Sequence, residues 1–168
     1  MPQGANATVQ TLDLLSHSPE ETRRLGARLG RLARPGDVLL LVGELGAGKT
    51  CLTQGIARGL GVRENASSPS FVIMKEYHGR LALYHIDLYR LERLQEVADL
   101  GLDDYLYGSG VCVVEWADRA PEQFPVQHLL VRMQYVSERE RSIHIEARGP
   151  RYVELLSQLS WATKAKGK

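Results

Sequence analysis

Gly43-Glu44-Leu45-Gly46-Ala47-Gly48-Lys49-Thr50 reads G-x-x-x-x-G-K-T, which is the spacing of a phosphate-binding P-loop. Residues 38–42, just before it, are an unbroken apolar run, typical of a strand buried on both faces of a parallel sheet. After the loop, Leu52, Ile56 and Leu60 recur every fourth residue, as on one face of a helix. The sequence therefore predicts a strand, a glycine-rich turn and a helix.

Each part of this pattern has a role in holding a polyphosphate. Backbone N–H groups cradle the phosphates, a helix N-terminus adds partial positive charge, and Gly46 and Gly48 keep side chains out of the way. Lys49 would place its ammonium between the terminal phosphates, and the Thr50 hydroxyl would hold Mg²⁺. The alternative, a glycine-rich turn that binds nothing, is disfavoured by the flanking strand and helix. We expect nucleotide contacts from Glu44, Leu45, Gly46, Ala47, Gly48, Lys49 and Thr50.

Length and composition indicate a small intracellular globular protein. The 168 residues fit a single P-loop domain, with disordered tails expected at 1–7 and 163–168. Because 21 Lys and Arg oppose 20 Asp and Glu, we expect no general basic footprint for RNA and no DNA contact. Cys51 and Cys112 lack a metal-binding spacing and fit a reducing compartment. With no signal-peptide pattern and no membrane-length apolar run, the protein is expected to be cytoplasmic, without membrane contact.

Helices and strands are expected on both sides of the P-loop. Ser18-Pro19-Glu20-Glu21 combines an N-cap, a proline at the first helical position and a capping-box glutamate, so a helix should begin there. Leu25, Leu29 and Leu32 would form its buried stripe. The other expected elements are strands at 8–14, 71–77, 81–87, 111–114, 128–136 and 141–147, helices at 92–100 and 151–161, and a turn at 102–106.

Two acidic residues end predicted strands. Asp87 closes the strand 81–87, where it could also be an ordinary turn residue. Glu115 follows four apolar residues, which is the Walker B pattern. We expect Asp87 to hold the metal and Glu115 to position the attacking water, although the two roles could be exchanged. The candidate catalytic residues are thus Lys49, Asp87 and Glu115, and the candidate metal ligands are Thr50, Asp87 and Glu115.

Three further features lie close to these acids in the sequence. Trp116 follows Glu115 and would either cover the nucleotide or pack in the core. His85 precedes Asp87 by two residues on a strand and therefore shares its face, while the histidines as a group show no metal-binding spacing. Ser67-Ser68-Pro69-Ser70 brings three hydroxyls, which would either order around a phosphate and its metal or remain a solvated loop.

The P-loop, together with His85-Ile86-Asp87-Leu88-Tyr89-Arg90-Leu91 and Val114-Glu115-Trp116, resembles the TsaE (also called YjeE) family. These are small bacterial P-loop ATPases needed to make threonylcarbamoyladenosine beside the tRNA anticodon. The resemblance implies an α/β P-loop NTPase fold with three α/β/α layers, in which antiparallel strands extend a parallel core sheet. It also implies ATP and Mg²⁺ as cofactors, and TsaD-like and TsaB-like subunits as partners. The near-neutral charge balance leaves any tRNA contact local or indirect, and we expect it to be indirect.

The same resemblance bears on individual residues. It implies that Lys49 and Thr50 are the functional P-loop pair, that Asp87 and Glu115 are the two acids, and that Trp116 is the tryptophan that follows the second acid.

Two positions depart from the family pattern. Cys51 stands where the family usually has a second threonine near the α-phosphate, and Ser70 replaces a usual threonine. We expect Cys51 and Trp116 to contact the nucleotide, with altered affinity and unchanged chemistry.

The leading hypothesis is an ATPase that acts as a nucleotide-dependent switch and resets a modification complex. No arginine is clearly placed as a finger, Arg90 and Arg93 being the possibilities, so hydrolysis should be slow alone and stimulated by partners. A small-molecule kinase is the alternative, but the region after Asp87 is short for an arginine-bearing lid. A GTPase is disfavoured because no N-K-x-D or D-x-x-G segment follows the P-loop. A nucleotide sensor without catalysis is the third class.

Overall fold

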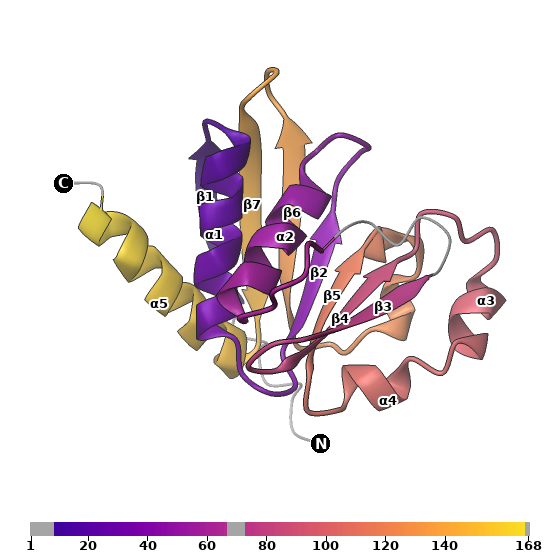
Figure 1. The fold of residues 1–168 in the computed structure, drawn as a ribbon. Helices are drawn as coiled ribbons and strands as arrows, with labels where there is room; N and C mark the ends of the chain where they lie inside the picture. Colours follow the sequence, from indigo (N-terminus) through magenta and orange to yellow (C-terminus); the bar gives the residue numbers. More distant parts are fainter. Residues whose placement is uncertain (1–8, 67–72, 167–168) are drawn as a thin grey trace.

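The computed structural model describes residues 9–66 and 73–166, and this part of the chain forms one seven-stranded sheet with helices on both faces (Figure 1). The strands are β1 (Val9–Ser16), β2 (Val38–Val42), β3 (Met74–His78), β4 (Ala82–Asp87), β5 (Val111–Glu115), β6 (His128–Tyr135) and β7 (Arg141–Arg148). The helices are α1 (Pro19–Leu32), α2 (Lys49–Gly59), α3 (Leu94–Asp99), α4 (Asp103–Leu106) and α5 (Pro150–Lys166), with 3-10 turns η1 (Ala117–Arg119) and η2 (Pro121–Gln123).

The sheet has a parallel centre and antiparallel edges. Its strand order is β1-β7-β6-β2-β5-β4-β3. Strands β6, β2, β5 and β4 run parallel to one another, whereas β7, β1 and β3 join by antiparallel pairing. The expected P-loop fold, a parallel core extended by antiparallel strands between two helical layers, is therefore confirmed.

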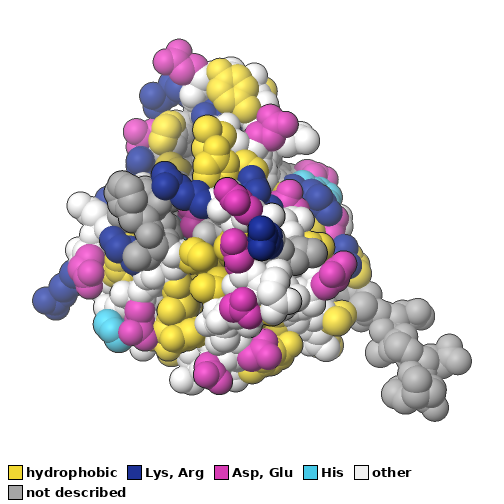
Figure 2. All heavy atoms as spheres, turned by 90° about the vertical axis from the view of Figure 1, so that its right-hand side faces the viewer, with side chains coloured by type: hydrophobic (Ala, Val, Ile, Leu, Met, Phe, Trp, Pro, Cys, Tyr) yellow, Lys and Arg dark blue, Asp and Glu magenta, His cyan; other side chains and the backbone are white. Residues whose placement is uncertain are grey.

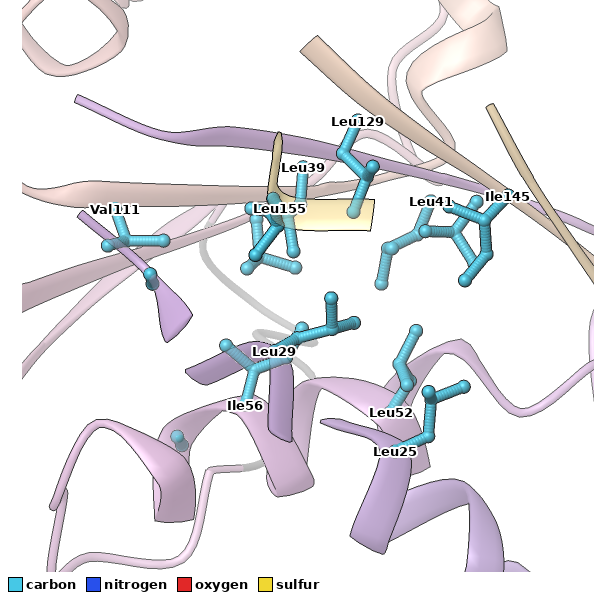
Figure 3. Close-up of a cluster of buried hydrophobic side chains, with 14 of the residues drawn as sticks. Leu25, Leu29, Leu39, Leu41, Leu52, Ile56, Val111, Leu129, Ile145 and Leu155 are labelled. Carbon is cyan, nitrogen blue, oxygen red and sulfur yellow. The ribbon is translucent and has the colours of Figure 1, made fainter. Parts of the chain in front are cut away.

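Each face of the sheet has its own hydrophobic core. Helices α1, α2 and α5 pack on one face, and Figure 3 shows Leu29 and Ile56 pointing from α1 and α2 toward Leu39 and Leu129 of the sheet. The short helices α3 and α4 and the turns η1 and η2 cover part of the other face, where Val97, Leu106 and Phe124 are buried. The long helices, including the P-loop helix α2, thus form one layer, and the short helices and turns form the opposite layer.

Helix α1 begins as the sequence predicts, with one difference at its cap. The Ser18 hydroxyl accepts a hydrogen bond from the Glu21 backbone N–H at 3.1 Å, and Leu25 and Leu29 are buried. The Glu21 carboxylate, however, accepts from the backbone N–H of His17 at 2.7 Å, one residue before the cap. It therefore secures the chain entering the helix.

Helices α1 and α2 approach each other closely because glycines line their contact. A Cβ on Gly26 would overlap the Leu52 carbonyl oxygen, and a Cβ on Gly55 would overlap that of Arg23. The amino-acid pattern of α1 predicts its leucine stripe but not this glycine contact. The close packing fixes the axis of α2, whose first turn carries Lys49 and Thr50.

The entrance to β2 is secured by helix α5. Asp37, which is buried, accepts hydrogen bonds from Arg151 Nε at 3.0 Å and Nη2 at 2.8 Å, and from the Arg34 backbone N–H at 2.8 Å. The next residue, Val38, donates its N–H to the Tyr152 hydroxyl at 2.9 Å. Burial raises the pKa of Tyr152 to about 12, so this hydroxyl stays protonated. The P-loop strand is thereby anchored at the end opposite its site.

Most expected elements form, with shifted boundaries. Helix α5 continues through Lys166, past residue 161, where the sequence placed its end, so the tail expected from 163 is helical as far as 166. The expected tail at 1–7 and the hydroxyl-bearing loop 67–70 lie outside the described residues. Across residues 9–66 and 73–166, no helix is long and apolar enough to span a membrane. Figure 2 shows one face of the molecule, on which acidic and basic side chains are mixed.

Candidate functional site

The predicted site residues meet at the carboxyl ends of the central strands. The P-loop follows β2, Asp87 ends β4 and Glu115 ends β5, and these two acids are paired across the parallel ladder. A pocket of ≈ 330 Å³ opens at this edge. Its lining consists of Leu45, Gly46, Ala47, Gly48, Lys49, Thr50, Cys51, Asp87, Tyr89, Glu115 and Trp116. Of the residues expected to contact nucleotide or metal, Glu44 lines a neighbouring pocket of ≈ 570 Å³ instead.

The P-loop backbone has the shape that phosphate binding needs. Gly46 and Gly48 have φ of +83° and +101°, in the left-handed region that side chains disfavour. Gly48 is the N-cap of α2 and offers no side-chain hydrogen bond to the first turn. The N–H groups at the start of α2 therefore remain available to an anion, where the helix dipole favours negative charge.

Lys49 lies across the mouth of the loop. Its Nζ donates to the carbonyl oxygens of Gly43 and Glu44, the latter at 3.0 Å, and lies 4.0 Å from the centroid of the Trp116 ring. Burial lowers the pKa of Lys49, while the Glu115 carboxylate is the first of the charges that oppose the shift. The ammonium is thus held over the pocket by contacts that a phosphate would replace with stronger, charge-assisted ones.

Thr50 and Glu115 are in direct contact. The Thr50 hydroxyl donates to Glu115 Oε1 at 3.3 Å, and Glu115 Oε2 is hydrogen-bonded to His85 Nε2. Both Glu115 and His85 are buried, at 2% and 0% exposure. Asp87 instead accepts the Tyr89 backbone N–H on Oδ1 at 3.0 Å. Glu115 is therefore the acid that stands beside the Thr50 hydroxyl, the group expected from the sequence to hold Mg²⁺.

Trp116 lines the pocket and also packs against the hydrophobic core. Its φ is +59°, and it is the single non-glycine residue with a positive φ in the part of the chain that the structure describes. Its ring lies 5.0 Å from that of Tyr89, and the Arg119 guanidinium lies 5.4 Å from it. A left-handed conformation at a bulky residue is strained, and such strain concentrates at functional positions.

Two arginines that the sequence did not single out lie close to the site. Arg119 stacks on Tyr89 and Trp116, and Arg141 Nε donates to the Gly46 carbonyl oxygen at 3.1 Å. The proposed candidates Arg90 and Arg93 are exposed and do not line the pocket. Arg119 could have been found by its closeness to Trp116 in sequence, whereas Arg141 is 95 residues from Gly46 and carried no signal.

Cys51 lies at the edge of the pocket, one residue after Thr50. Its Sγ donates to the Pro19 carbonyl oxygen at 3.3 Å, and burial raises the pKa of its thiol. The thiol is therefore hydrogen-bonded to the first residue of α1.

The donor set fits a magnesium ion bound together with a nucleotide. Thr50, Asp87 and Glu115 offer oxygen atoms, the ligands that Mg²⁺ prefers. Among the described residues, no three His, Cys, Asp or Glu side chains form a group that could hold a metal by themselves. Phosphate oxygens and water would have to complete the shell, as is usual for Mg²⁺ in phosphoryl-transfer sites.

Comparison with known proteins identifies the family. Residues 16–143 match the family model described as "Threonylcarbamoyl adenosine biosynthesis protein TsaE". The tRNA threonylcarbamoyladenosine biosynthesis protein TsaE of Bacillus subtilis is 48% identical over 144 residues, covering 85% of this chain and 90% of that protein. The protein of the same name from Treponema pallidum is 41% identical over 131 residues, covering 78% and 97%.

A solved structure supports the same assignment. The crystal structure of YdiB from Bacillus subtilis superposes with a TM-score of 0.82 at 42% sequence identity, covering 92% of this chain and 97% of that one. Sequence and fold therefore agree, and this chain belongs to the TsaE family of tRNA threonylcarbamoyladenosine biosynthesis proteins.

Proposed function

We propose that this protein is an Mg²⁺-dependent ATPase that acts as a nucleotide-dependent switch in the complex that makes threonylcarbamoyladenosine on tRNA. The observation that carries the proposal is the convergence of Lys49, Thr50, Asp87 and Glu115 on one pocket at the carboxyl edge of the sheet. The P-loop backbone would hold the phosphates, and Lys49 would neutralise charge on the terminal ones.

The two acids have separate roles in this proposal. The contact between Thr50 and Glu115 supports Glu115 as the residue that holds the metal shell with the Thr50 hydroxyl. Asp87, at the neighbouring strand end, would then orient the attacking water, which exchanges the two roles first expected. When bound, Mg²⁺ would offset the negative charge that develops on the phosphates.

Partners complete the proposed cycle. ATP would favour the form that docks TsaD-like and TsaB-like subunits, and hydrolysis would release or reset them. The mixed charge of the face in Figure 2 and the net charge of +1 support an indirect role for tRNA. Arg119 and Arg141 both donate hydrogen bonds to carbonyl oxygens of the chain. Arginines held in this way are not free to act as an arginine finger, which supports slow hydrolysis without partners.

The proposal is tested by ATP hydrolysis alone and with the two partner subunits. We expect slow turnover alone and a clear stimulation by partners. Glu115→Gln should raise the Mg²⁺ concentration for half-maximal rate, while Asp87→Asn should lower kcat by about 10²-fold or more at unchanged Mg²⁺ dependence. Turnover on the order of tens per second alone, unaffected by partners, would contradict the switch.

The same assay separates the alternatives. A small-molecule kinase would form a phosphorylated metabolite in proportion to ADP, whereas an ATPase releases inorganic phosphate. A nucleotide sensor would bind ATP without releasing either product. Displacement of bound ATP by GTP at equal concentration would reopen the GTPase hypothesis.

A further inference from the structure

A wholly buried histidine stands behind the acid at the site. His85 lies on β4, two residues before Asp87, and its strand pairs with β5 so that His85 is opposite Val113. Its Nε2 is hydrogen-bonded to Oε2 of Glu115, two residues further along β5. Glu115 lines the pocket, whereas His85 lies outside its lining. We infer that His85 is a positioning residue, which fixes the Glu115 carboxylate so that its other oxygen faces Thr50. This inference rests on the proposed ATPase.

Glu115 is constrained from two sides. Oε2 is bonded to His85, and Oε1 lies 3.3 Å from the Thr50 hydroxyl. A buried carboxylate is costly to leave without a donor, so losing His85 would turn or displace it. Because Thr50 is on α2 and His85 is on β4, the carboxylate bridges the P-loop helix and the sheet.

The surroundings of His85 indicate which ring nitrogen carries the proton. Nδ1 is buried and has no hydrogen-bond partner in the part of the chain that the structure describes. Because a carboxylate oxygen accepts hydrogen bonds, the ring nitrogen that carries the proton toward Glu115 is Nε2.

Histidine–carboxylate pairs behind a metal site orient the groups that act on the metal. Losing such a supporting contact typically costs about 10–100-fold in metal affinity or activity. At this site the loss should reach the magnesium shell and turnover through Glu115. Nucleotide affinity should change little, because His85 is not among the residues that line the pocket at the P-loop.

Three variants separate positioning from packing. In His85→Gln the side-chain amide nitrogen falls near the original Nε2, whereas in His85→Asn it falls near Nδ1, and His85→Leu has no donor. In steady-state assays over a range of Mg²⁺ concentrations, we expect the Asn and Leu variants to lose about 10–100-fold in kcat and to need more Mg²⁺. The Gln variant should regain most of the loss, and all three should bind ADP as the wild type does.

A cycle with Glu115→Gln gives the decisive readout. If His85 acts through Glu115, then His85→Leu added to Glu115→Gln should neither lower kcat nor raise the Mg²⁺ requirement beyond the effect of Glu115→Gln alone. Independent losses that multiply, or equal kcat in the wild type and the Leu variant, would overturn the inference. Should the Asn variant fail to fold, shown by its thermal unfolding, the Leu and Gln variants complete the comparison. A wild type that binds ATP but never hydrolyses it would overturn the proposed function instead, and this inference with it.

Discussion

The Lys49 ammonium lies 4.0 Å from the centroid of the Trp116 ring, while it donates to the carbonyl oxygens of Gly43 and Glu44. A cation over an indole face contributes about 0.5–2 kcal/mol, depending on its solvation. Phosphates at the P-loop would offer the ammonium stronger partners, so nucleotide binding should draw it away from the ring. Nucleotide binding should therefore change the contact between Lys49 and Trp116.

This coupling predicts a fluorescence change on nucleotide binding. Adding Mg²⁺ and ATP should alter tryptophan emission with a saturable dependence on ATP, because the ring environment of Trp116 changes. Trp116→Phe removes this reporter and keeps an aromatic face for Lys49, while the second tryptophan, Trp161, remains. An equal emission change in Trp116→Phe would show that the signal arises elsewhere.

Cys51→Thr should tighten nucleotide binding a few-fold. The Cys51 thiol lies beside the P-loop and donates a hydrogen bond to the Pro19 carbonyl oxygen. A threonine hydroxyl is a better hydrogen-bond donor to a phosphate oxygen than a thiol is. The measurement is the dissociation constant of ADP, with Cys51→Ser as a control that adds the hydroxyl alone. Weaker binding in both variants would mean that the thiol suits this pocket better.

Breaking the Asp37–Arg151 pair should strongly destabilise the fold. Asp37 is 3% exposed and accepts hydrogen bonds from two guanidinium nitrogens of Arg151. Asp37→Ala should therefore lower the free energy of unfolding by about 3–5 kcal/mol, because it leaves the Arg151 charge partly buried and without its carboxylate partner. The matched control is Glu154→Ala, which breaks the exposed Arg34–Glu154 pair and should cost less than about 1 kcal/mol. Urea unfolding measures both, and equal losses would contradict the anchoring of β2 by α5.

His144 should make stability depend on pH. The hydrogen bond to Asp13 is the main cause that raises the pKa of His144 above its ordinary value of 6.5. The stabilisation by this pair is therefore fully present below the unfolded pKa and is lost as pH rises through the folded one. His144→Gln should lower the free energy of unfolding more at about pH 5 than at about pH 9. A loss of equal size at both values would contradict the raised pKa.

The local parts of the fold could be predicted from sequence because their determinants are adjacent. The apolar run before Gly43, the glycines and the helical periodicity after Thr50 lie within one short stretch, and β2, the P-loop and α2 form there. Asp87 and Glu115 were both expected as strand-end acids from their local patterns, and the structure pairs them at the ends of β4 and β5.

Other features depend on contacts between distant residues. Arg141 reaches Gly46 across 95 residues and Arg151 reaches Asp37 across 114, and neither pair has a local pattern. The glycine contact between α1 and α2 requires their relative positions to be known. The proposal that Glu115 holds the metal likewise rests on the Thr50 contact, which the sequence positions of two strand-end acids could not reveal.

Calorimetric titration with Mg²⁺ and ATP tests the central claim most directly. Lys49→Met keeps the side-chain length and removes the ammonium, so it serves as the matched control. The account predicts saturable binding by the wild type, and binding by Lys49→Met that is weaker by about 10²-fold or more, since one charged contact to phosphate is worth about 1.5–3 kcal/mol and the P-loop lysine meets more than one oxygen. No heat of binding by the folded wild type at about millimolar ATP would contradict it.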